Sequence, residues 1–281
     1  MVTEYLLACP ITSYSHRLRP DSFGILMKPE AAIQVSNLTE SSFLVIARDI
    51  VGAKSIEDFY SVGHTVISNF LVALNIATLG LFGWTRNETY PFPQYSLLDP
   101  TDPPTVKILL QKPGIPFPTD PKDELTEEEI QKSVLLFRAL ASEPVSDVGW
   151  EYLKGLYHLT TLIYDVEFRK DAFGNFYRAL EFFISDRVLR VRKLKNELRD
   201  IQKALLDLGF SDVIIEEFRE LYMIRSKQVM HAQRGLGSVD WDAVGKMKMF
   251  TDAVMHKVYQ PIWEAEIAKL RAQSFSPDSQ A

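Results

Sequence analysis

The stretch FRKDAFGNFYRALEFFISDRVLRV, residues 168–191, decides how the second half of this chain folds. Apolar residues recur in it at helical spacing, at Phe173, Phe176, Leu180, Phe183 and Ile184. They cover most of the circumference of the helix that this spacing predicts. A helix that is apolar on nearly all sides needs other elements packed around it. The stretch therefore predicts a central, buried helix.

Helical patterns continue on both sides of this stretch, from about residue 125 to residue 272. Thr126 and Glu129 have the spacing of a capping box, which starts a helix. Further helices are expected to begin near Gly149, at Ser211 and at Asp240, and Pro261 is expected to kink the last one. The pattern predicts an all-α antiparallel helical bundle over 125–272, followed by a disordered tail at 273–281.

The first 120 residues have a different pattern. Short apolar or β-branched runs at 23–28, 31–36 and 42–51 predict strands, and a long helix is expected to follow Ser55. Nine of the fifteen prolines lie between residues 91 and 121, which predicts a linker with one short strand at 105–112. The fold class is therefore α+β, with a small mixed α/β domain over 1–120 before the bundle.

Composition excludes several classes of protein. The single cysteine, Cys9, cannot form an internal disulfide or a cysteine-based zinc site, and no basic secretory signal opens the chain, so we expect a cytoplasmic protein. Residues 1–150 hold 11 basic and 18 acidic side chains, and residues 151–281 hold 20 and 19. This balance is unlike the basic excess of a dedicated DNA-binding domain.

A stretch without Asp, Glu, Lys or Arg, residues 59–85, is long enough to span a bilayer. His64, Ser68, Asn69 and Asn75 interrupt it, and its N-terminal flank is acidic. We therefore expect a buried helix of a soluble domain and no membrane partner, with a membrane anchor as the alternative.

The usual signatures of metal-dependent or nucleotide-dependent catalysis are absent from the sequence. It has no glycine-rich phosphate loop, no GxSxG elbow and no HExxH motif, and its five histidines are scattered. We therefore expect no metal and no cofactor.

The remaining candidate for a functional site is the helix after Ser211, in which Arg225 lies on the same stripe as Ile214, Phe218 and Leu221. A guanidinium on a core-facing stripe must be paired or line a cleft, because an unpaired buried charge is very costly.

His231 follows Arg225 by six positions, about 120° round an ideal helix, so the two converge only if the arginine reaches across or the helix distorts. The segment LYMIRSKQVMHA, 221–232, resembles the R-x(4–6)-H motif of HEPN domains, helical bundles of prokaryotic RNases, toxins and phage-defence proteins. The stretch FYRALEFFISDRVLRVRKL, 176–194, is similar to the alanine-leucine-glutamate helix that precedes the motif helix in that family. Leu221-Tyr222 before Arg225-Ser226 is similar to the LY-x-x-RS form of the motif in the ApeA-like branch of that family. The resemblance covers about residues 125–272.

This resemblance implies a metal-independent endoribonuclease that leaves a 2′,3′-cyclic phosphate, with Arg225 and His231 as the catalytic pair. Arginine grips a phosphate with a bidentate fork, and histidine moves a proton near neutral pH. The resemblance further implies RNA as the substrate, a homodimer through the C-terminal bundle, a role in phage defence or as a toxin, and a regulatory or antitoxin protein as a further partner.

Several other side chains are assigned supporting roles. We expect Glu181 to pair with Arg225, and Tyr222 to complete the core or to stack on a base. A basic run either tracks an RNA backbone or forms a solvated helix face; its members are Arg187, Arg190, Arg192, Lys193 and Lys195. Ser226 stands where catalytic HEPN members often carry Asn, Asp or His. It favours the alternative function, a non-catalytic HEPN-like module that binds a nucleotide, RNA or a partner protein.

Overall fold

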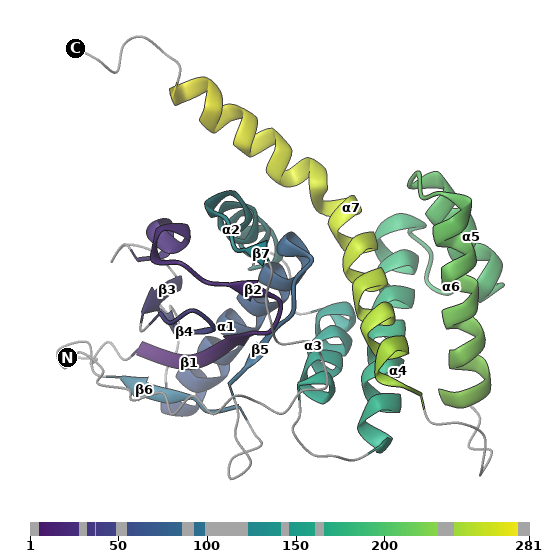
Figure 1. The fold of residues 1–281 in the computed structure, drawn as a ribbon, viewed down its shortest axis with the longest axis horizontal. Helices are drawn as coiled ribbons and strands as arrows, with labels where there is room; N and C mark the ends of the chain where they lie inside the picture. The colour runs from purple at the N-terminus through teal and green to yellow at the C-terminus, as the bar shows by residue number, and fades with distance from the viewer. Residues whose placement is uncertain are drawn as a thin grey trace.

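The computed structural model describes residues 6–27, 33–36, 38–48, 55–85, 93–98, 123–141, 146–160, 166–229 and 239–274. An antiparallel sheet with one long helix comes first, and helices make up the rest of the described chain (Figure 1). The α+β prediction, with its helical second half, is confirmed.

A five-stranded antiparallel sheet is built around one central strand. Its strands are β1 (Leu6–Ser13), β3 (Ile33–Ser36), β4 (Ser42–Ala47), β5 (Phe82–Trp84) and β6 (Ser96–Leu98). The order is β3-β4-β1-β5, and β6 pairs with the first half of β1 while β5 pairs with its last residues. The register of β1 with β4 places Cys9 opposite Val45. The thiol of Cys9 is fully buried in this sheet.

Two of the strand predictions for the first 50 residues are confirmed and one is wrong. β3 and β4 lie within 31–36 and 42–51, as predicted. Residues 23–26 are not a strand, because Pro20–Leu26 forms the 3₁₀ helix η1, and residue 28 lies outside the described residues. Pro20 sets the first helical φ angle, and Phe23 and Leu26 are buried one 3₁₀ turn apart. β1 itself was not predicted, and the predicted strand at 105–112 lies outside the described residues.

The proline-rich stretch is partly sheet. β6 lies inside it and pairs with β1, so residues 96–98 belong to the N-terminal sheet. A second, two-stranded sheet follows, in which β7 (Asp123–Glu124) pairs in parallel with β2 (His16–Arg17). The chain beyond the prolines therefore returns to the N-terminal region before the helices begin.

Helix α1 (Ile56–Thr78) is the central element of the N-terminal region. Its predicted cap is confirmed, because the Ser55 side chain accepts a hydrogen bond from the Asp58 amide. By length and composition the stretch Glu57–Thr78 could cross a membrane, but 56% of its most apolar window is buried inside the protein. One such helix is weak evidence for a membrane span, because the buried core helix of a soluble protein passes the same test.

Six further helices follow in the described residues. They are α2 (Glu127–Ala141), α3 (Asp147–Leu159), α4 (Val166–Phe183), α5 (Glu197–Asp207), α6 (Asp212–Ile224) and α7 (Trp241–Ser274). The capping box is confirmed: the Thr126 amide donates to the Glu129 carboxylate at 2.8 Å, and the Glu129 amide donates to the Thr126 hydroxyl at 3.2 Å.

The predicted central helix is α4. Phe173, Phe176, Leu180 and Phe183 are all fully buried. α4 packs between α3 and α7, and it ends in a π-helical turn, η2 (Ile184–Val188). A second π-helical turn, η3 (Arg225–Val229), ends α6.

Helix α7 is the longest element, and Figure 1 shows it changing direction along its length. Pro261, where a kink was predicted, lies inside this helix. The helix includes the first two residues of the predicted tail, and residues 275–281 lie outside the described part of the chain.

One apolar core joins the sheet region to the helices. A single cluster of buried residues includes Leu7 and Val45 of the sheet, Phe70 of α1 and Phe176 of α4. Helix α2, which the sequence assigned to the bundle, packs along α1 and against η1. The side chain of Ser22 donates to the carbonyl of Leu125. The described sheet and helices therefore share a continuous core, and the predicted boundary near residue 120 lies outside the described residues.

Candidate functional site

Helix α6 positions the residue on which the sequence analysis depends. Phe218 and Leu221 are buried as predicted, but Ile215 is more buried than the predicted Ile214. Arg225 follows on this side of the helix and is the first residue of the π-helical turn η3. A π turn makes i to i+5 hydrogen bonds, so it changes the direction of the residues that come after Arg225.

Arg225 is held by a carboxylate and by two aromatic rings. Its guanidinium lies 3.2 Å from Oε2 of Glu197, and the two side chains are only 17% and 22% exposed. The centre of the guanidinium lies 4.9 Å from the centroid of the Tyr177 ring and 6.0 Å from that of Tyr222. The Tyr177 hydroxyl donates to Oε1 of Glu197 at 2.5 Å. We call this group the Arg225 cluster: Arg225, Glu197, Tyr177 and Tyr222.

The carboxylate that pairs with Arg225 is Glu197, so the prediction that Glu181 forms this pair is wrong. Glu181 lies one turn after Tyr177 on α4 and is half-buried. Burial and the negative charge of Glu197 raise the pKa of Glu181, and Arg225 opposes that rise. Glu181 therefore lies close enough to Arg225 for the positive charge to lower its pKa, while Glu197 forms the ion pair with the guanidinium.

Tyr177 and Glu197 are members of the cluster that sequence reasoning missed. Tyr177 is 1% exposed, and its pKa is raised by burial and by the hydrogen bond to Glu197. Glu197 lies in the first turn of α5, after the N-cap Asn196. A glutamate there looks like an ordinary acid at a helix start, so its position in sequence gives no sign of the contact with α6.

Three further predicted site residues belong to the motif segment. Tyr222 is half-buried and packs on the core, as one of its two predicted roles required. Ser226 is half-buried inside the π turn η3. His231, the predicted partner of Arg225, lies outside the described residues.

The basic run lies beside the Arg225 cluster, in η2 and in the loop that leads to α5. The exposed cations of this loop are Arg190, Arg192, Lys193 and Lys195. Arg187 differs from them, because it forms an ion pair with Asp186 at 3.2 Å. The positive charge of Lys193 acts on Glu181, which places this loop within electrostatic reach of the cluster.

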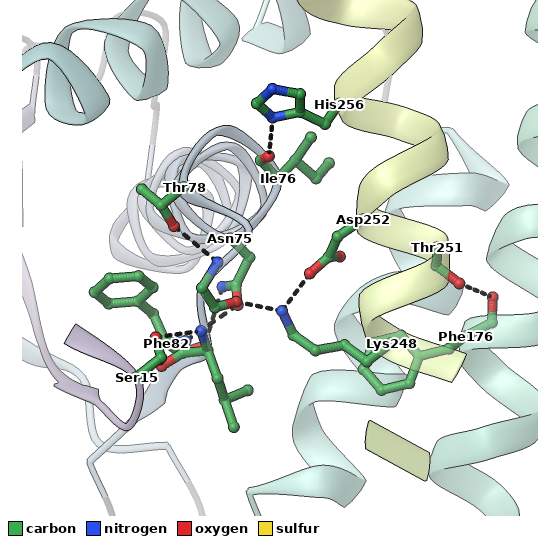
Figure 2. A network of polar contacts seen from close by, with 12 residues as sticks. Ser15, Asn75, Ile76, Thr78, Phe82, Phe176, Lys248, Thr251, Asp252 and His256 are labelled. Atoms are coloured by element: carbon green, nitrogen blue, oxygen red, sulfur yellow. Dashed lines mark hydrogen bonds and ion pairs between the residues drawn. The ribbon is translucent and has the colours of Figure 1, made fainter. Parts of the chain in front are cut away.

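A second polar group, also missed by sequence reasoning, lies where α7 meets the N-terminal region (Figure 2). Lys248 donates to the carbonyl of Gly80, just after α1, and to the carboxylate of Asp252. The hydroxyl of Tyr152 donates to the other oxygen of Asp252. Burial lowers the pKa of Lys248 and raises that of Asp252, and each partner opposes the shift of the other. A Lys–Asp pair four residues apart on a helix is usually a surface pair, which is why its sequence gave no signal.

The junction holds further contacts between α7 and α1. Nδ1 of His256 lies 2.9 Å from the carbonyl of Ile76, as Figure 2 shows. Burial lowers the pKa of His256. Because the Lys248 and Asp252 side chains are only 4% and 0% exposed, this ion pair is sealed from solvent, whereas His256 is half-buried. A substrate cannot reach a sealed ion pair, so the role of this pair is to stabilise the packing of α7 against the N-terminal region.

A metal site is not found in the part of the chain that the structure describes: no three His, Cys, Asp or Glu side chains gather there in a way that could hold an ion. Comparison with protein-family models, curated proteins and solved structures gave no match. The functional argument therefore depends on the residues of this chain.

Proposed function

We propose that the helical half is an RNA-directed module of HEPN type, in which Arg225 binds a phosphodiester and His231 moves the proton of a metal-independent RNA cleavage. The observation that carries this proposal is the Arg225 cluster. A guanidinium, partly open to solvent, is oriented by a carboxylate and two rings at the start of a π-helical turn. Helix distortions of this kind are frequent at functional sites.

The chemistry divides between the two residues. Arg225 stays charged at any working pH and would stabilise the charge that develops on the phosphate oxygens. His231 would take the proton of the 2′-hydroxyl nucleophile or give one to the leaving 5′-oxygen. A 2′-hydroxyl nucleophile restricts the substrate to RNA. The exposed cations Arg190, Arg192 and Lys195 would hold the RNA backbone beside the cluster.

Further parts of the proposal follow from the resemblance to HEPN domains. We propose a cytoplasmic homodimer in which two copies of the bundle bring their motif helices together, and a role in phage defence or as a toxin. A regulatory or antitoxin protein would then control it. The N-terminal sheet region would sense the trigger or select the target.

A second function is favoured by a specific observation, the ion pair between Arg225 and Glu197. A guanidinium that is already neutralised serves binding or structure as readily as catalysis. In this alternative the same surface binds RNA, a nucleotide or a partner protein without cutting it, as Ser226 also suggests.

Cleavage of total RNA and of single-stranded oligonucleotides in EDTA separates the two functions. The first predicts cleavage that persists in EDTA, spares DNA and leaves a 2′,3′-cyclic phosphate. His231→Ala and Arg225→Ala should each lower the rate by roughly 10²–10⁴-fold. Arg219→Ala is the matched control, because Arg219 lies on the same helix in an exposed pair with Glu216. RNA binding without any cleavage by the wild-type protein would support the alternative.

A further inference from the structure

The pair between Arg225 and Glu197 differs from the other buried ion pair in one respect. Lys248 and Asp252 are sealed, with side chains 4% and 0% exposed. Arg225 and Glu197 are 17% and 22% exposed, so both side chains contact solvent. An accessible pair can exchange its partner, whereas a sealed pair cannot.

Glu197 presents to Arg225 the same chemistry as a phosphodiester. Carboxylates and phosphates both offer two oxygens to the guanidinium fork, and they compete for the same donors. Glu197 also has a second partner that does not depend on Arg225, the Tyr177 hydroxyl at 2.5 Å. A Glu197 side chain that left Arg225 would therefore keep one hydrogen bond.

The surroundings favour an anionic polymer as the competitor. Figure 1 places α5 and α6 at the end of the molecule that is farthest from the sheet, and the exposed basic loop lies next to α5 in sequence. Arg190, Arg192 and Lys195 of this loop are exposed. They would bind neighbouring phosphates and raise the local concentration of the one that reaches Arg225.

We propose that Glu197 occupies the phosphodiester site of Arg225 in the free protein, and that the backbone of single-stranded RNA binds by displacing it. This inference rests on the proposed function in naming RNA as the ligand, and it deepens that function by adding a built-in competitor. Glu197 is then a positioning residue that limits the affinity of the site. Its removal should improve binding, which damage to the fold would not do.

The experiment measures binding of a fluorescent 2′-O-methyl RNA oligonucleotide, which lacks the free 2′-hydroxyl and so cannot be cut by the proposed mechanism. The full-length wild type is compared with Glu197→Gln, which removes the charge and keeps the shape. Glu216→Gln is the matched control, since it removes one negative charge from an exposed glutamate–arginine pair on α6. Tyr177→Phe removes the hydrogen bond to Glu197 without changing the net charge. The double variant Glu197→Gln with Arg225→Ala tests whether any increase in RNA affinity depends on Arg225.

We expect Glu197→Gln to bind roughly tenfold more tightly than the wild type, the scale of one hydrogen bond to a charged group. The slope of log affinity against log salt should steepen by about 0.7, the value for one more phosphate contact on a single strand. Tyr177→Phe should not raise affinity, because the tyrosine hydroxyl holds Glu197 both before and after its displacement. The double variant should lose the gain.

Equal affinities for the wild type, Glu197→Gln and Glu216→Gln would overturn the proposal, and so would weaker binding by Glu197→Gln or no binding by any variant. The proposed function is judged separately, by cleavage in EDTA. Tighter binding by Glu197→Gln without RNA cleavage would support the displacement of Glu197 and contradict the proposed nuclease activity. Cleavage without a gain removes only the competitor role.

Discussion

Lys246 and Lys248 lie two residues apart on α7, and each forms an ion pair with an aspartate four residues away. The Lys246–Asp242 pair is exposed, whereas Lys248 and Asp252 are buried at the junction with α1. Exposed pairs contribute little, because water already solvates both charges. Removing one partner of a buried pair lowers stability strongly, because the other charge remains buried without a partner.

The first prediction compares these two lysines. Lys248→Met should lower the free energy of unfolding by about 3–5 kcal/mol, because Asp252 would remain buried without its counter-ion. Lys246→Met should leave the free energy of unfolding nearly unchanged. Urea denaturation of the two variants beside the wild type checks this. Losses of similar size would show that the Lys248 junction contributes no more than a surface pair.

At the scale of elements, the packing of α3 on α4 depends on one small residue. Gly155 lies on α3 where the Phe176 ring of α4 comes closest, and a Cβ at position 155 would lie 2.8 Å from that ring. Phe176 is fully buried, so the ring has little room to move. Outside the backbone of its own helix, a Cβ at Gly149 would come closest to the hydroxyl of Ser146, at 3.9 Å.

The second prediction is that alanine at these two positions has opposite effects. Gly155→Ala should destabilise the protein by roughly 1–3 kcal/mol, the usual cost of overpacking a core. Gly149→Ala should stabilise it by about 0.5–1 kcal/mol, because alanine loses less entropy than glycine in a helix. Thermal unfolding followed by far-ultraviolet circular dichroism measures both. Stabilisation by Gly155→Ala would mean that α3 and α4 are not in tight contact at this point.

At the scale of the whole molecule, the sheet region and the helices share one apolar core. Helix α1 packs against the sheet and also against α2, α3 and α7. Lys248 and His256 of α7 bind the carbonyls of Gly80 and Ile76 across the same junction. Neither half can unfold without exposing apolar surface of the other.

The third prediction is a single cooperative unfolding transition, although the sequence predicts two domains. We expect the calorimetric enthalpy of unfolding to equal the van 't Hoff enthalpy. Two resolved heat-absorption peaks would contradict this and would show that the N-terminal region unfolds as a separate unit.

The sequence by itself determined the local features of this protein. Capping side chains set the starts of two helices, at Ser55 and at Thr126. Apolar periodicity predicts the buried face of α4 and the α+β order. Both signals act over a few residues. The sequence also required that Arg225 be paired or line a cleft, since its stripe faces the core.

Only the tertiary structure decided which groups meet. The partner of Arg225 is Glu197 rather than Glu181, and Lys248 is buried against Gly80 from a distant part of the chain. The central strand β1 and the 3₁₀ helix at Pro20–Leu26 likewise depend on what packs against them. Contacts of this kind arise from how helices and strands pack, and Arg225, Glu197 and Lys248 look in sequence like ordinary surface charges. Their pairing is set by the shape of the whole core, which no local pattern encodes.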